Sequence, residues 1–193
     1  MTSTAGSELE AARARVRACM LRRAGLSGGY AQADSDLGRR VYALARAGRG
    51  SYLWGEPGAG KTHAAACAVR MYAERGIGSR LVTAKRLLDE VRDGYDGGDR
   101  GALERAERVP LLALDDLGAE RPTDWAVEQL SALIDARTAA GLPTVVTSNY
   151  RIGGLRDLWG GMAGKRVASR LAGACEPVEV AGPDRRLACS RTA

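Results

Sequence analysis

The residues best suited to chemistry form one short segment that fits the G-x-x-x-x-G-K-[ST] pattern of a phosphate-binding loop. The segment reads Gly55, Glu56, Pro57, Gly58, Ala59, Gly60, Lys61, Thr62. Glycines let successive backbone N–H groups point at phosphate oxygens, and the helix that follows adds the positive end of its dipole. We therefore expect ATP here, with Lys61 at the β- and γ-phosphates and the Thr62 hydroxyl on Mg²⁺.

Two adjacent carboxylates follow a second apolar run. Asp115 and Asp116 end the stretch Leu-Leu-Ala-Leu-Asp-Asp. We expect Asp115 to hold Mg²⁺, through a water molecule, and Asp116 to polarise the water that attacks the γ-phosphate. Because Asp is one methylene shorter than Glu, the same pair also predicts slow turnover.

Two further polar residues are candidates for the same site. Asn149 follows the apolar run Thr-Val-Val-Thr-Ser, at the carboxyl edge where α/β proteins bind ligands, and is expected to align the attacking water. His63 is the only histidine and follows Thr62 directly. Since it has no evident acid or base partner, we assign it a packing or hydrogen-bonding role beside the loop.

The elements that must position these residues alternate along the chain. We expect strands at 51–54, 80–84, 110–115, 144–148 and 177–181, and helices at 61–75, 85–93, 101–108, 124–140 and 162–172. Near-continuous apolar strands are typical of a parallel sheet that is buried on both faces. The sequence thus predicts a three-layer α/β phosphate-loop NTPase with a five-stranded, mostly parallel sheet and no helical lid domain.

The first part of the chain has a different pattern. A helix is expected over 7–24, capped by Ser7, then a linker or loop over 26–35 and a second helix over 36–47. We divide the chain into an N-terminal basic helix with linker (1–35) and an ATPase domain (36–193). The glycine-rich segment 94–101 is expected to be a mobile loop.

Composition limits the class of protein. The 193 residues are 45% hydrophobic and 27% charged, as in globular proteins, and no apolar run is long enough for a membrane span or a signal peptide, so we expect a cytoplasmic protein. The net charge of +6 divides into +5 over 1–50, −3 over 51–150 and +4 over 151–193. The four cysteines are not spaced as metal ligands, and we expect reduced thiols, with a Cys175–Cys189 disulfide as the alternative.

Together these residues resemble the AAA+ ATPases of the helicase-loader (DnaC/DnaI) type and the related ATP-binding subunits of IstB-type transposition systems. The resemblance runs from about Arg23 to Arg186 and rests on the loop ending Gly-Lys-Thr-His and on Leu-Asp-Asp-Leu-Gly, Leu-Pro-Thr-Val-Val-Thr-Ser-Asn-Tyr and Arg-Val-Ala-Ser-Arg-Leu. Paired aspartates are usual in this family, so Asp116 is a family feature.

The resemblance also implies self-association. Arg170 would be an arginine finger that reaches the γ-phosphate bound by a neighbouring subunit, where its fixed charge stabilises the transferring phosphoryl group. Arg166, one helical turn earlier, would assist or be solvated. Arg185 or Arg186 resembles the family's terminal arginine near the nucleotide.

The partner implied by the resemblance is a hexameric replicative helicase loaded onto single-stranded DNA, and the alternative partner is a transposase. Lys85, Arg86 and Arg92 would contact DNA phosphates, and the basic helix from Glu8 to Arg23 would dock on the partner or lie on the protein's own core. Two other hypotheses about function remain open. One is a small-molecule kinase, and the other is a nucleotide-gated binding module that hardly hydrolyses ATP.

Overall fold

A five-stranded parallel sheet forms the centre of the molecule. The computed structural model describes residues 3–95, 97–120 and 122–184, and its side chains from Ser7 onward. The strands are β1 (Gly50–Trp54), β2 (Ser79–Thr83), β3 (Leu111–Leu117), β4 (Thr144–Ser148) and β5 (Cys175–Glu179). Their order is β2-β3-β4-β1-β5, and every pairing is parallel. The predicted sheet is confirmed.

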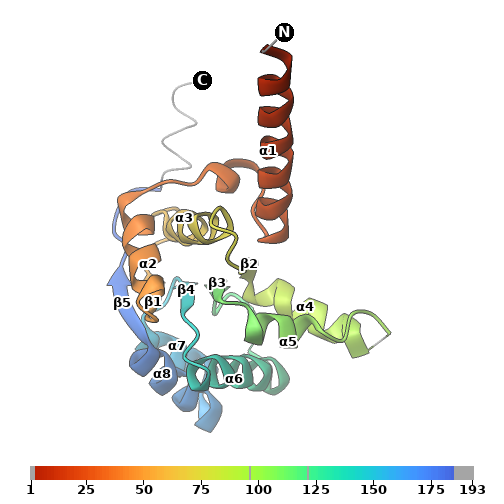
Figure 1. Ribbon diagram of the computed structural model, residues 1–193. Helices are drawn as coiled ribbons and strands as arrows, with labels where there is room; N and C mark the ends of the chain where they lie inside the picture. Colours follow the sequence, from red (N-terminus) through yellow and green to blue (C-terminus); the bar gives the residue numbers. More distant parts are fainter. Residues whose placement is uncertain (1–2, 96, 121, 185–193) are drawn as a thin grey trace.

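Helices cover both faces of the sheet, as the sequence predicts (Figure 1). One face carries α2 (Asp36–Arg46), α3 (Lys61–Ala73), a short 3₁₀ helix at Gly28–Gln32 and the end of α1 (Ser3–Arg23). The other carries α4 (Ala84–Tyr95), α5 (Ala102–Arg108), α6 (Asp124–Ala139), α7 (Ile152–Trp159) and α8 (Gly161–Ala174). Within the described residues no helix follows β5, and none is long and apolar enough to cross a membrane.

Each face has its own hydrophobic cluster. Against one face lies the alanine-rich α3, in which every residue from Ala64 to Val69 is buried. Its small side chains let α2 approach so closely that a Cβ at Gly38 would lie 2.4 Å from the Cys67 Cβ. On the other face, leucines of the sheet pack against leucines of the covering helices, among them Leu112 of β3, Leu130 of α6 and Leu171 of α8. Both layers hold the carboxyl ends of the strands in one row.

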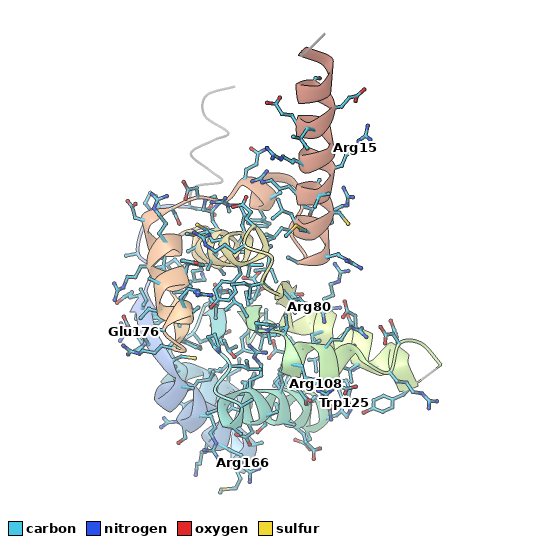
Figure 2. The ribbon with its side chains drawn as sticks, in the orientation of Figure 1. Arg15, Arg80, Arg108, Trp125, Arg166 and Glu176 are labelled. Atoms are coloured by element: carbon cyan, nitrogen blue, oxygen red, sulfur yellow. The ribbon has the colours of Figure 1, made fainter. Side chains whose placement is uncertain are left out.

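The N-terminal helix differs from its expected form. It begins at Ser3, before the expected cap Ser7, so the acidic residues near its start lie beyond its first turn. Its first turns extend away from the body, with Arg15 pointing outward (Figures 1 and 2) and Val16 60% exposed. Its last turn is anchored, because Leu21 is buried and Leu81 N donates to Ala24 O at 2.8 Å.

The segment expected to be a linker also packs on the core. Leu26 is 1% exposed and Ala33 fully buried, and Ala33 O accepts a hydrogen bond from Arg70 Nε at 2.8 Å. Because this segment is rich in Gly and Ser, its composition did not indicate that Leu26 and Ala33 are buried. Their packing holds the segment, and with it the end of α1, against α3.

The secondary structure differs from prediction at three further places. The helix α7 was not predicted, because its eight residues include Gly153 and Gly154 and are too few to show periodicity. Gly160 and Gly161, both with positive φ, separate it from α8. The latter passes directly into β5 at Cys175, two residues earlier than the expected strand. In the expected loop 94–101, Gly94 and Tyr95 belong to α4.

The cysteines agree with the expectation of reduced thiols. Cys19, Cys67 and Cys175 are free, and burial raises the pKa of the Cys175 thiol to about 12. Cys189, the alternative partner for Cys175, lies outside the described residues.

A fully buried arginine joins the helices to the sheet on the second face. Arg137 of α6 donates to the Thr144 hydroxyl at the start of β4 and to the carbonyl oxygens of Pro143 and Val109. It also reaches the last carbonyls of α5, at Ala106 and Glu107. Burial lowers the pKa of this guanidinium to about 10. One side chain thus closes the end of α5 and fixes the start of β4.

Arg137→Gln is expected to lower the free energy of unfolding by about 3 kcal/mol or more, because it leaves several buried carbonyl oxygens without donors. Urea unfolding followed by circular dichroism measures the change. The control is Arg166→Gln, at an exposed position of α8, which should change stability by about 0.5 kcal/mol or less. Equal stability of the two variants would contradict this role of Arg137.

Candidate nucleotide-binding site

The phosphate-binding loop lies between β1 and α3, as the sequence predicts. Gly55, Gly58 and Gly60 all have positive φ, and Gly60 is the N-cap of α3. At Gly55 a Cβ would lie 2.3 Å from the Val180 carbonyl oxygen, so only glycine fits. The loop therefore curls because three positions accept a backbone that other residues rarely adopt.

Lys61 crosses the loop and reaches the next strand. Only 7% of this residue is exposed, and Nζ donates to Gly55 O at 2.6 Å, to Glu56 O at 2.8 Å and to Asn149 Oδ1 at 2.8 Å. Asn149, at the carboxyl end of β4, is therefore in contact with the loop. This contact agrees with the prediction that the phosphate-binding loop and Asn149 lie at the same edge of the sheet.

Asp115 is the buried carboxylate of the site. Its Oδ1 accepts hydrogen bonds from the Thr62 hydroxyl at 2.9 Å and from the Thr147 hydroxyl at 2.6 Å. Burial raises the pKa of Asp115, while these two hydroxyls oppose the rise. The sequence did not indicate this role of Thr147, because the role depends on the pairing of β3 with β4. Asp115 thus joins the loop helix, β3 and β4.

Asp116 lies outside the regular strand because β3 contains a bulge. Leu114 pairs with Val146 and Leu117 with Ser148, so Asp115 and Asp116 both stand opposite Thr147. Asp116 N donates to Thr147 Oγ1 at 2.9 Å, and its φ is 58°, the one positive value among described residues other than glycine. The expected strand end at residue 115 was therefore too early. The bulge leaves one carboxylate buried and the next exposed.

The residues after Asp116 hold its conformation. Ala119 N donates to Asp116 O at 3.2 Å, and Ser148 Oγ donates to Leu117 O at 2.6 Å. A left-handed conformation costs a residue with a side chain about 1–2 kcal/mol. These bonds and the Thr147 contact offset that cost.

The residues present fit Mg²⁺. Thr62 Oγ1 donates to Asp115 Oδ1 at 2.9 Å, so the two side chains meet at the loop, where Thr62 would bind the ion directly and Asp115 would bind it through a water molecule. Mg²⁺ usually takes only one or two protein ligands beside phosphates and water. Accordingly, the described residues contain no group of three or more His, Cys, Asp or Glu that could hold a metal alone.

Other parts of the chain border the loop. His63 Nε2 lies 3.3 Å from Asp34 N and 3.1 Å from Asp34 O, which agrees with its expected hydrogen-bonding role. After β5 the chain returns to the loop, where a Cβ at Gly58 would meet the Asp184 carboxyl carbon at 2.0 Å. Arg185 and Arg186 lie outside the described residues.

The proposed finger residues lie on α8, on the face opposite α3 (Figures 1 and 2). Arg170 is about half exposed, and its Nε donates to Asp135 of α6 at 2.9 Å. Arg166 is exposed and points to solvent (Figure 2). A pair of this kind at the surface is worth at most about 1 kcal/mol, so it holds Arg170 only weakly.

The basic residues expected at DNA have partners on the protein. Lys85 pairs with Asp89 at 2.7 Å, Arg86 pairs with Glu90, and the Arg92 guanidinium lies 5.0 Å from the centre of the Trp125 ring. Lys85 and Arg86 remain about three-quarters exposed. The local charge of this helix is therefore mixed rather than strongly positive.

Asp115→Asn is expected to stabilise the nucleotide-free protein increasingly as the pH rises. Because the pKa of Asp115 is raised in the folded state, the folded protein binds its proton more tightly, and this contribution to stability is lost as pH rises from the unfolded value of about 4 through the raised value. Asn carries no charge to bury and still accepts both hydroxyls.

Urea unfolding of wild type and variant between about pH 4 and pH 8, a range that begins near the reference carboxyl pKa, gives the difference directly. The control is Glu128→Gln, which removes an exposed carboxylate from α6. A difference that does not change with pH would contradict the expected cost of ionising Asp115.

Comparison with known proteins places the chain in a family. The family model for IstB-like ATP-binding proteins matches residues 43–193. The replicative helicase loader DnaI of Bacillus subtilis is 31% identical over 105 residues, which cover 53% of this chain and 34% of DnaI. The loader DnaC of Buchnera aphidicola subsp. Baizongia pistaciae is 26% identical, covering 61% and 48%. The chain thus spans about a third to a half of these relatives.

Solved structures agree with the fold. The crystal structure of DnaI has a TM-score of 0.67 at 28% identity, covering 78% of this chain and 81% of that one, and the DnaC helicase loader has 0.66 at 27%, covering 80% and 100%. AMPPCP-bound DnaA from Aquifex aeolicus shares the fold at 18% identity (TM-score 0.63), covering 75% of this chain and 44% of that one. With its phosphate loop, buried Asp115 and parallel sheet, this chain belongs to the IstB-like ATP-binding family of AAA+ proteins.

Proposed function

We propose that this protein binds ATP with Mg²⁺ and hydrolyses it slowly, at a rate that rises when neighbouring copies assemble. The observation that carries the proposal is the Asp115 carboxylate, which joins Thr62 of the loop to β4 while Asp116 stands exposed beside it. One carboxylate for the metal and one for water is the set that phosphoryl transfer to water requires.

Each residue has a defined task in this reaction. Backbone N–H groups of the loop and Lys61 bind the phosphates, while Thr62 and Asp115 hold Mg²⁺, which when bound supplies positive charge that offsets charge developing on the phosphates. Asp116 orients the attacking water and accepts its proton as the bond from the γ-phosphorus to the bridging oxygen breaks. Asn149 keeps its amide N–H groups for this water, because its Oδ1 accepts from Lys61.

Assembly enters through Arg170. Its guanidinium is about half exposed on α8 and forms a surface ion pair with Asp135. Breaking such a pair costs little free energy, so Arg170 can instead bind the nucleotide of a neighbouring copy. Placed at the neighbour's γ-phosphate, it stabilises the charge that develops there. Hydrolysis then depends on contact between subunits.

The biological reaction proposed for this ATPase is the loading of a hexameric replicative helicase onto single-stranded DNA. Support comes from two relatives and a solved structure that are themselves named helicase loaders. The exposed, basic outer part of α1, with Arg15 pointing away from the body, offers a surface for the partner (Figure 2). Lys85 and Arg86 are exposed enough to exchange their carboxylate partners for DNA phosphates.

A second candidate is supported by the matching family model. That family is named for IstB-like ATP-binding proteins of the IS21 type, so the same ATP-driven assembly would select target DNA for a transposase. Both candidates use the same site and differ in the partner. Recovery of the partner therefore separates them.

Lys61→Ala is expected to weaken ATP binding about 10- to 100-fold, since it removes a charge-assisted hydrogen bond worth about 1.5–3 kcal/mol. Arg170→Ala should leave ATP affinity unchanged and lower kcat of the assembled protein about a thousandfold. Nucleotide titration and steady-state phosphate release measure the two quantities. The surface control is Arg156→Ala on α7, which should match wild type in both. Normal hydrolysis by Arg170→Ala would refute the finger.

The ATP-bound protein is expected to capture a replicative helicase and to load it onto closed single-stranded DNA circles, whereas Lys61→Ala should do neither. Affinity capture followed by a loading assay on circles without ends tests this, because a ring on a closed circle must have been opened. Capture of a transposase in place of a helicase would reverse the order of the two candidates.

A further inference from the structure

A buried carboxylate, Glu120, lies four residues after Asp116 and has no task in the chemistry described above. Only 6% of Glu120 is exposed, and its Oε2 accepts a hydrogen bond from Gly118 N at 2.9 Å. Its Oε1 is buried without a hydrogen-bond partner among the described residues, and so is Nε1 of Trp159. Burying an unpaired carboxylate oxygen is costly, so this side chain acts against the stability of the fold.

Glu120 sits between the Asp116 turn and α7. Burial raises the pKa of Glu120, whereas the backbone N–H groups of Glu120 and Gly118 and the Trp159 indole favour its charged form. The indole is therefore near the carboxylate, although its geometry falls short of a hydrogen bond. The nearby Asp116 charge raises the pKa of Glu120 further.

The backbone of the turn after Asp116 is closely packed at Gly118. Gly118 has a φ of 94°, and a Cβ there would lie 3.0 Å from Leu155 Cδ1 and 3.1 Å from Tyr150 Cδ2. Ala119 N already binds Asp116 O. A change in the Gly118 peptide therefore passes directly to the left-handed backbone of Asp116.

The far side of Glu120 leads to the helix of the proposed finger. Trp159 ends α7, and its Cβ lies 3.1 Å from the Cβ position of Gly164 in α8. The helix α8 also carries Arg170. Glu120 therefore lies between the turn that contains Asp116 and the helices α7 and α8, the second of which carries the proposed finger.

We propose that Glu120 is a positioning residue for ATP hydrolysis: by accepting the Gly118 N–H, it fixes the turn that aims Asp116 at the attacking water. The inference rests on the proposed ATPase function. Glu120 acts only through Asp116 and takes no part in nucleotide binding.

The test is steady-state ATP hydrolysis by the full chain carrying Glu120→Met, which fills the same space with an apolar side chain that accepts no N–H bond. The expected result is a fall in kcat of about 10- to 100-fold with KM for ATP within about twofold of wild type, because misplacement of a reacting group costs this much. Glu120→Gln retains an acceptor for Gly118 N and should recover kcat to within about threefold of wild type, a small change on the same scale. The matched control is Glu128→Met on the exposed face of α6, with unchanged kcat.

A double-mutant cycle with Asp116→Ala decides the route of the effect. If Glu120 acts through Asp116, Glu120→Met changes kcat by less than about twofold in the Asp116→Ala background. An equal fall in both backgrounds, or wild-type kcat in Glu120→Met, would overturn the inference. Equal hydrolysis by wild type and Asp116→Ala would instead refute the proposed function, and the two failures are thus distinguishable.

Discussion

The site depends on one buried carboxylate that is shared by two hydroxyls. Asp115 Oδ1 binds Thr62 of the loop helix and Thr147 of β4 at the same time, and so joins three elements that are far apart in sequence. Burying a charge is costly unless it is hydrogen-bonded, and these two donors offset part of that cost. The remaining cost is consistent with the proposed Mg²⁺ site, since a preformed site must hold its ligand charge before the ion arrives.

The same contact separates the tasks of two adjacent aspartates. In a regular strand Asp115 and Asp116 would point to opposite faces of the sheet. The bulge opposite Thr147 instead gives two residues one partner, so that Asp115 turns inward to the loop while Asp116 stays exposed at the same edge. The left-handed φ of Asp116 is the cost of this arrangement, and the turn through Gly118 and Glu120 maintains it.

The sequence predicted the parallel sheet, the loop and the residues at its edge because each has a local signal: alternating apolar runs, glycines at fixed spacing, and polar residues directly after buried strands. It could not predict the bulge, since a register shift depends on the partner strand, nor the role of Thr147, which appears only once β3 and β4 are paired. Eight residues containing Gly153 and Gly154 gave no periodic signal for α7. Burial of Glu120 and Arg137 likewise follows from tertiary packing alone.

In the proposed mechanism, hydrolysis needs one subunit to bind ATP and another to supply Arg170. Mixing the two defective variants tests this: Lys61→Ala subunits bind ATP about 10- to 100-fold more weakly but keep the finger, and Arg170→Ala subunits bind ATP but lack the finger. The measurement is phosphate release as a function of the mixing ratio at constant total protein. The activity of the mixture should exceed the sum of the two variants alone and peak at an intermediate ratio. Activity equal to the weighted sum at every ratio would contradict this mechanism.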